Sequence, residues 1–117
     1  MIITTIMAFA AIAMSSSSIT WNNTTLDIGE VKKGQEVSLS FTFENTGTVP
    51  VKILEAKGSC GCTAVTFSEE DVQPGATAKI LASFRSEKEG AFNKTVTVRV
   101  SNQLEPTVLT FKGQVRD

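Results

Sequence analysis

The stretch Glu36-Val-Ser-Leu-Ser-Phe-Thr-Phe-Glu44 decides the fold class of this chain. Its apolar residues recur at every second position and so share one face: Val37, Leu39, Phe41 and Phe43. The serines and the threonine between them share the other face. A period of two is typical of a strand with one buried face in an antiparallel sheet. The stretch therefore predicts a strand whose large side chains enter a hydrophobic core.

The same alternation continues on both sides of this strand, and no window shows a sustained helical period of 3.6 residues. The other predicted strands are Ile19–Ile28, Val51–Lys57, Thr63–Phe67, Thr77–Arg85, Phe92–Ser101 and Thr107–Val115. About seven short strands joined by Gly, Pro and Asn turns are typical of an antiparallel β-sandwich. A closed barrel is the alternative, and the uneven strand lengths disfavour it. The inward residues of the later strands are predicted to be Ala78, Ile80, Ala82, Phe84, Phe92, Val96, Val98, Val100, Leu109, Phe111 and Val115.

Composition excludes several classes of function. The chain has 117 residues, the length of one domain, and its net charge is −1. Its basic residues are scattered, which argues against a nucleic-acid surface. Because it contains no His and only two Cys, it lacks Ser-His-Asp and Cys-His nucleophile pairs and cannot build a structural zinc site alone. We expect no metal, no cofactor and no catalytic residue.

The first fourteen residues, Met1–Met14, carry no charged side chain and are apolar apart from two threonines. They are too few to span a bilayer, which takes about 20 residues, but they fit the apolar region of a secretory signal. Ala8-Phe-Ala10 or Ala11-Ile-Ala13 supplies the small residues of a cleavage site. A buried N-terminal strand or helix, or a start codon assigned at the wrong place, is the alternative.

This segment sets the expected domain boundaries. We predict a signal peptide over residues 1–18 and a sandwich domain over residues 19–117, exported to the periplasm, the cell surface or the medium. No Cys lies near the cleavage zone, so a lipoprotein anchor is not expected. The mature chain is expected to contain no transmembrane segment.

Both cysteines lie in Lys57-Gly-Ser-Cys-Gly-Cys-Thr63, at the end of a predicted strand. In a flat strand, residues two apart have Cα atoms about 6.6 Å apart, and a disulfide needs about 4.4–6.8 Å. A bridge between Cys60 and Cys62 is therefore barely reachable, and easier if Gly58 or Gly61 bends the chain. Closing so small a loop is worth only about 1.6 kcal/mol. Stability alone is a poor reason for such a pair.

Several interpretations of Cys60 and Cys62 stay open. The pair is a structural element that shapes the turn, as a local disulfide or as packed thiols, or a redox dithiol that exchanges disulfides with a partner. A redox site needs a helix N-terminus or a cation to lower the thiol pKa, and Lys57 is the nearest cation in sequence. Capture of a soft metal would need a second chain. Pairing between molecules is the remaining possibility.

Six stretches of the sequence follow one another in a recognisable order: Phe41-Thr-Phe-Glu-Asn-Thr-Gly47, Val51-Lys-Ile53, Gly58-Ser-Cys-Gly-Cys-Thr63, Val72-Gln-Pro-Gly75, Gly90-Ala-Phe-Asn-Lys94 and Val98-Arg-Val-Ser-Asn102. In this order they resemble the bacterial family called Domain of Unknown Function 1573 (DUF1573). The resemblance covers about Leu26 to Val115, and Ser59-Cys-Gly-Cys-Thr63 is its most specific part. It implies an exported immunoglobulin-like sandwich related to PapD, major sperm protein and ASH domains, typical of Bacteroidetes-type envelopes. It implies no biochemical activity and no catalytic residue.

The sequence as a whole favours a non-enzymatic module that binds a protein partner. The turns Cys60–Thr63 and Asn45–Pro50 are the expected contact points, since loops and free strand edges recruit partners in such sandwiches. A thiol-disulfide redox protein that uses the Cys-Gly-Cys turn is the alternative. The acidic run Glu69–Asp71 lacks the spacing of a calcium loop and is expected to be a solvated loop.

Overall fold

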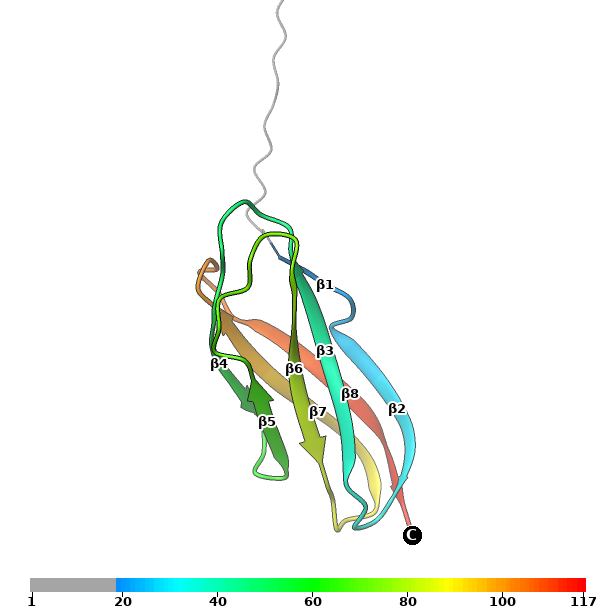
Figure 1. Cartoon of the computed structure of the whole chain (residues 1–117). Helices are drawn as coiled ribbons and strands as arrows, with labels where there is room; N and C mark the ends of the chain where they lie inside the picture. Colours follow the sequence, from blue (N-terminus) through cyan, green and yellow to red (C-terminus); the bar gives the residue numbers. More distant parts are fainter. Residues whose placement is uncertain (1–18) are drawn as a thin grey trace, which may run out of the picture.

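The structure, a computed structural model, describes residues 19–117, and the predicted signal over residues 1–18 lies outside this part. Eight strands form two sheets that face each other (Figure 1). The strands are β1 Ile19–Trp21, β2 Thr25–Lys32, β3 Val37–Asn45, β4 Ile53–Gly58, β5 Thr63–Phe67, β6 Thr77–Phe84, β7 Gly90–Val100 and β8 Thr107–Arg116. Sheet A has the order β1-β3-β6-β5 and sheet B the order β2-β8-β7-β4. The all-β sandwich that the sequence predicts is confirmed.

The strand expected over Ile19–Ile28 is divided between the two sheets. β1 pairs antiparallel with β3 in sheet A, whereas β2 pairs parallel with β8 in sheet B. The Asn22 N–H donates to Thr42 O at 2.9 Å, the last bond to sheet A. The Thr24 carbonyl then accepts from the Thr110 N–H at 2.8 Å, the first bond to sheet B. Two consecutive asparagines, which favour turns, mark this crossing. The domain thus has eight strands rather than seven, and one pairing is parallel.

The strand expected from Val51 begins at Ile53 instead, as β4. Val51 pairs in an isolated antiparallel bridge with Val72. The Val51 N–H donates to Val72 O at 3.0 Å, and the Val72 N–H donates back at 2.6 Å. The segment that leads into β4 is therefore paired with the loop that follows β5. This pairing closes the side of the sandwich beyond the C-terminal end of β5.

The core lies between the two sheets and consists of the inward residues of the alternating strands. The residues under one-tenth exposed include Phe41, Phe43, Ile80, Phe84, Val96, Val98, Val100, Leu109, Phe111 and Val115. Phe84, Phe92 and Phe111 pack ring against ring, with centroids 4.6–6.3 Å apart. Val37, Leu39 and Phe92 lie on the predicted face but are only partly buried. The predicted inward faces are confirmed.

Candidate functional site

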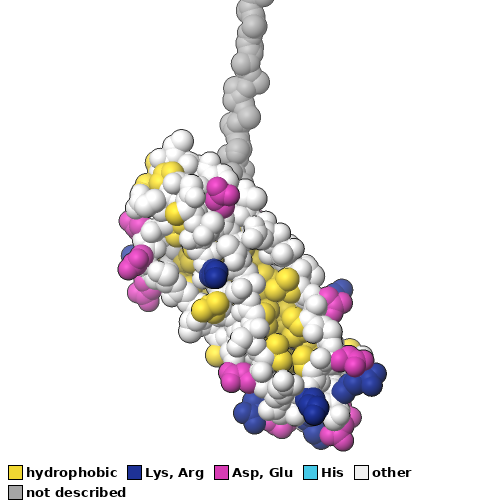
Figure 2. All heavy atoms as spheres, turned by 45° about the vertical axis from the view of Figure 1, so that its right-hand side comes forward, with side chains coloured by type: hydrophobic (Ala, Val, Ile, Leu, Met, Phe, Trp, Pro, Cys, Tyr) yellow, Lys and Arg dark blue, Asp and Glu magenta, His cyan; other side chains and the backbone are white. Residues whose placement is uncertain are grey.

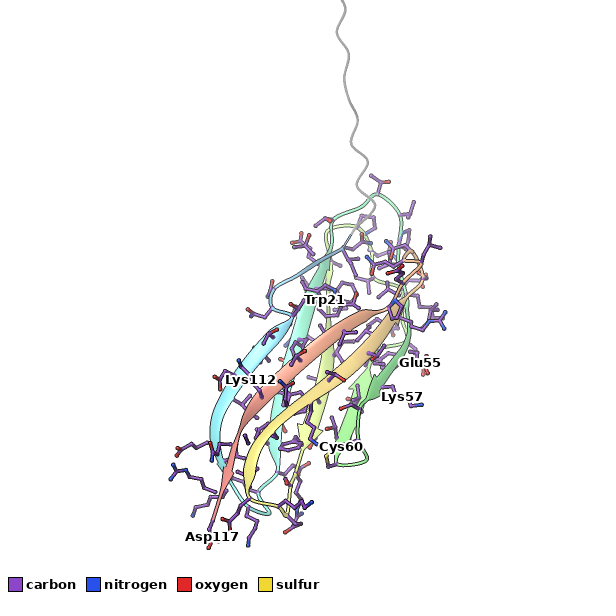
Figure 3. The ribbon with its side chains drawn as sticks, turned by 180° about the vertical axis from the view of Figure 1, so that it is seen from behind. Trp21, Glu55, Lys57, Cys60, Lys112 and Asp117 are labelled. Carbon is purple, nitrogen blue, oxygen red and sulfur yellow. A yellow bond between two sulfur atoms is a disulfide. The ribbon has the colours of Figure 1, made fainter. Side chains whose placement is uncertain are left out.

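The Cys-Gly-Cys turn is the crossover by which the chain leaves sheet B and enters sheet A. It joins β4, the last strand of sheet B, to β5, the last strand of sheet A (Figure 3). Cys60 and Cys62 form a disulfide in the structure, with their Cα atoms 5.3 Å apart. This separation is shorter than the roughly 6.6 Å of a flat strand. The chain is therefore bent where the bridge forms.

Hydrogen bonds hold the turn to both sheets. On the sheet B side, the Ser59 N–H donates to Thr95 O at 2.9 Å, and Ser59 Oγ accepts from the Thr95 N–H at 3.1 Å. On the sheet A side, the Cys62 carbonyl accepts from the Arg85 N–H at 3.3 Å. The Thr63 N–H closes the turn by donating to Cys60 O at 3.3 Å. The disulfide thus spans a segment that the backbone already anchors at both ends.

The two glycines of the turn, which were expected to allow the chain to bend, differ in what the structure requires of them. Neither Gly58 nor Gly61 has a positive φ, so neither is needed for a left-handed conformation. A Cβ at Gly58 would lie 3.0 Å from the Cβ of Thr63, and a Cβ at Gly61 would meet nothing within 4 Å. Gly58 is therefore required for the close approach of β4 and β5, and Gly61 is not.

The turn offers little chemistry beyond that of its disulfide. Both cysteines are partly buried, and Lys57 is exposed on β4, which runs into the turn (Figure 3). The described residues contain no helix, so no helix N-terminus lies near the sulfurs. Within residues 19–117 no three His, Cys, Asp or Glu side chains are grouped to hold a metal ion. What the bridged sulfurs can do directly is thiol-disulfide exchange.

The second predicted contact point, Asn45–Pro50, lies at the opposite end of the sandwich (Figure 1). Its first residue is a fully buried Asn that ties two loops together. Asn45 Nδ2 donates to Val49 O at 2.9 Å and to Val72 O at 2.8 Å, and Asn45 Oδ1 accepts from the Gly47 N–H at 2.9 Å. The fold therefore does not bring the two predicted contact points together, and Asn45 is a structural residue.

Sheet B interrupts the ladder of its edge strand β2. The register between β2 and β8 shifts between Asp27 and Glu30, where Gly29 has a φ of 73°. Asp27 Oδ1 accepts from the Gly29 N–H at 3.0 Å and so holds this bulge. Arg116 forms an ion pair with Glu30 at 3.0 Å. Bulges and charges of this kind prevent a further strand from adding to an edge.

The other edge strand of sheet B, β4, has the same two features. Its register with β7 shifts between Ile53 and Glu55. Glu55 and Lys57 are exposed along it (Figure 3), and Glu55 lies opposite Arg99. Both edges of sheet B are therefore irregular and charged.

The edges of sheet A have neither feature. β1 is three residues long and pairs only with the end of β3, from Phe43 to Asn45. Since the Thr42 carbonyl faces β1, the alternation of a strand turns the backbone groups of Ser38 and Ser40 to the same side. There they have no strand partner in residues 19–117. At the other edge, β5 is a regular, uncharged Thr-Ala-Val-Thr-Phe strand.

The sandwich is also open on its side between β2 and β3. Figure 2 shows hydrophobic side chains gathered there in an elongated patch. The partly buried side chains from this side are Trp21, Leu26, Ile28, Val31 and Leu39. Trp21 packs edge-on against Phe43 with ring centroids 4.9 Å apart and so covers this edge of the core. Its buried Nε1 has no hydrogen-bond partner among residues 19–117.

Sequence reasoning did not single out the backbone edges of Ser38–Ser40 and Thr63–Phe67. Their lack of charge is visible in the sequence, but a strand's position in a sheet is not. Only the pairing order places β5 at an edge and leaves β3 half covered. The described residues contain no helix that could cross a bilayer.

Comparison with known proteins supports the resemblance found in the sequence. The model of the family described as "Protein of unknown function (DUF1573)" matches residues 19–115. No curated protein matches the chain.

Solved structures with low sequence identity share the fold. A protein of unknown function from Porphyromonas gingivalis W83 has a TM-score of 0.70 at 11% identity, over 87% of this chain and 50% of that one. The chain thus spans half the length of that protein. PapD-like domain 7 of human CEP192 has a TM-score of 0.67 at 12% identity, over 98% and 97% of the two chains. The secreted serine protease VesC from Vibrio cholerae has a TM-score of 0.65 at 14% identity, over 86% of this chain and 23% of that one. At such identities the likeness concerns the fold alone.

Proposed function

We propose that this chain, which belongs to the DUF1573 family, is an exported, non-enzymatic module that binds a protein partner by accepting a strand at an edge of sheet A. The observation that carries this function is the contrast between the sheets. β2 and β4 are bulged and charged, whereas β5 and the Ser38–Ser40 part of β3 are regular and uncharged. An open, regular edge presents unpaired N–H and C=O groups to another extended chain.

Export is the second element of the proposed function. It is supported by the signal-like composition of residues 1–18 and by the Cys60–Cys62 disulfide, since such bridges persist in oxidising compartments. The test is the intact mass of the protein from a native envelope fraction, alkylated without reduction. A shortened chain with no alkylated thiol is the expected result. A full-length chain with two alkylated thiols would refute export.

Site-specific photo-crosslinking in the native envelope tests the binding function. A photoreactive phenylalanine analogue is placed at Thr66 on β5, at Ser40 on β3 or at Glu55 on β4, all three exposed. A discrete adduct from Thr66 or Ser40, and none from Glu55, is expected. No adduct from either position on sheet A, or equal adducts from all three positions, would exclude strand addition at this sheet.

A second candidate function is thiol-disulfide exchange, and one observation favours it. The bridge closes so small a loop that it stabilises the fold by only about 1.6 kcal/mol, and hydrogen bonds already anchor the turn without it. Stability is therefore a weak reason for the bridge, which leaves exchange as a use for it. A redox protein should lose its activity when either Cys60 or Cys62 is replaced by Ser. A binding module should keep its partner after both replacements. Titration of the disulfide in glutathione buffers distinguishes a reducible bridge from a structural one.

A further inference from the structure

β5 is the edge of sheet A with the simplest geometry. The Cys62 carbonyl accepts from the Arg85 N–H, which turns the backbone of Cys62 toward β6. By alternation, Ala64 and Thr66 also face β6, whereas the N–H and C=O groups of Val65 and Phe67 face away from it. The strand therefore presents a regular row of backbone groups to the outside, without a charged side chain in its length.

The loop that follows β5 limits this edge at its far end. After Phe67 the chain leads to Val72, which pairs with Val51 in the segment before β4. Between them stand the carboxylates of Glu69, Glu70 and Asp71, all exposed. A strand laid antiparallel along β5 would therefore have its N-terminal end against three negative charges.

A hollow in the surface opens beside the same end of β5. It lies between the loop and the first half of β6, and Glu70 and Asp71 line it together with apolar side chains. Phe67 and Leu81 are among these, and Leu81 is 49% exposed although it is a large hydrophobic residue. Lys79 is the one cation among the lining residues. The hollow thus combines an apolar wall with an excess of negative charge.

We propose, on the basis of the binding function above, that β5 accepts an extended segment of another polypeptide in antiparallel orientation, with a Lys or Arg and an apolar residue at the segment's N-terminal end. The backbone of Val65 and Phe67 pairs with the added strand. The basic side chain lies against Glu70 and Asp71, and the apolar one enters the hollow beside Leu81. Charge complementarity at one end fixes the direction of the strand, which the uniform edge cannot do alone.

The open part of β3 lacks this combination. Charged side chains of both signs lie near the Val37 end of β3, and they already have partners. Lys33 pairs with Glu89, and Glu36 accepts a hydrogen bond from Ser83. Glu36 keeps its negative charge, but it is a single carboxylate, whereas three exposed carboxylates lie beyond the end of β5. β3 is therefore the competing site in the experiment, and a second copy of this chain is the competing occupant.

The test uses isotope-labelled protein in its native N-terminal form and three synthetic peptides. All three peptides share a core of six residues in which Val and Thr alternate. The first has two Lys at its N-terminal end, the second has two Lys at its C-terminal end, and the third has two Glu at its N-terminal end. The peptide with N-terminal lysines is expected to shift the amide signals of Val65 and Phe67. The other two peptides are expected to bind with an affinity about fivefold lower, because they lose the exposed charge pairs. Shifts centred on Ser38 and Ser40, or equal binding of all three peptides, would overturn the assignment.

Two variants make the test specific. Val65→Pro removes the outward N–H without breaking the bonds to β6, and binding should fall about tenfold or more. Val65→Ala loses the same side chain, keeps the N–H and should bind within about threefold of the original. If Val65→Pro does not fold, the double substitution Glu70→Lys and Asp71→Lys, at two exposed positions, serves instead. It should make the peptide with N-terminal glutamates bind more tightly than the one with N-terminal lysines. An unchanged preference would refute the proposed site.

The experiment separates the failure of this inference from that of the proposed function. If the envelope crosslinks arise at Ser40 and not at Thr66, binding through sheet A stands and the assignment to β5 falls. If neither position crosslinks, both fall. Sedimentation of the protein without peptide should show a monomer. If the protein is instead a dimer, and Val65→Pro dissociates it while Val65→Ala does not, the occupant of β5 is a second copy of the chain.

Discussion

The two sheets of this domain treat their edges in opposite ways. In sheet B, each edge strand carries exposed charges and a shift of register, at Asp27–Glu30 in β2 and at Ile53–Glu55 in β4. In sheet A, β5 keeps its register with β6 throughout, and Val37–Phe43 of β3 carries no charge. Strand edges are sites of unwanted pairing that soluble proteins usually block. This contrast is the ground on which we propose sheet A as the contact surface.

The same contrast shows that the open edges are not a by-product of the fold. β4 and β5 are consecutive strands joined by a tight turn, and both lie at edges. β4 has Glu55 and Lys57 on its surface, whereas β5 has Ala64 and Thr66 at comparable exposed positions. Neither set is needed for the core. The two strands therefore differ in surface charge and in register, and substitutions of exposed side chains can exchange the charges alone.

The largest expected effect comes from Asn45→Ala, because Asn45 holds the loops at the end of sheet A. The change leaves Val49 O, Val72 O and the Gly47 N–H without their side-chain partner. Since the bond to Val72 O is buried and the other two are partly buried, the free energy of unfolding should fall by about 3 kcal/mol in urea denaturation. Thr46→Ala, at the exposed neighbour, should change it by less than about 0.5 kcal/mol. A loss for Asn45→Ala equal to that of its neighbour would contradict the role assigned to the amide.

Gly113→Ala tests whether the bulge in β2 is built into the packing of sheet B. A Cβ at Gly113 would lie 2.8 Å from the ring of Phe92 and would collide with the Gly29 carbonyl of the bulge. Overpacking of this kind should lower the stability by about 2 kcal/mol. Gly61→Ala, where a Cβ meets nothing within 4 Å, is the matched control. If both variants unfold at the same urea concentration, the bulge is not held by this contact.

Much of this fold could be predicted from the sequence, because each long strand buries one face. Phe41, Phe43, Ile80 and Phe111 are inward in the alternation and at most 1% exposed in the structure. The division of Ile19–Ile28 was not predicted, since both halves are extended and the alternation does not say which sheet a strand joins. Sheet membership is decided by hydrogen bonds to residues far away in the sequence.

The candidate site was predicted less well, for a related reason. Proximity of Cys60 and Cys62 follows from their spacing, but the sequence made a bridge only barely reachable and left their state open, whereas the structure joins them. The edge position of β5 depends on its pairing with β6 alone. The hollow beside Leu81 depends on a loop that Val72 ties to Val51. No local pattern encodes either of these long-range arrangements.

Replacing both Cys60 and Cys62 by Ser tests whether the crossover between the two edges depends on the disulfide. The expected loss in urea denaturation is at most about 1.6 kcal/mol, since the hydrogen bonds of Ser59 and the Cys62 carbonyl hold the turn independently. The unchanged protein in excess reductant should show the same stability. A loss about twice as large would mean that the bridge, and not the backbone, positions β5.

Exchanging the surface charges of β4 and β5 should have the smallest effect on stability and a large one on binding. Ala64→Glu with Thr66→Lys gives β5 the charges of β4, and Glu55→Thr with Lys57→Thr removes them from β4. All four side chains are exposed, so each pair should change the free energy of unfolding by about 0.5 kcal/mol or less per residue. The charged β5 should no longer bind the lysine peptide, because charges on an edge strand oppose strand addition.

The neutral β4 should remain closed to the peptide, which separates charge from register. Its shift between Ile53 and Glu55 breaks the even row of backbone groups that an added strand needs. If amide signals of β4 move when the peptide is added, charge alone protected that edge. If they do not, the regular register of β5 is the property that distinguishes the open edge from the closed one.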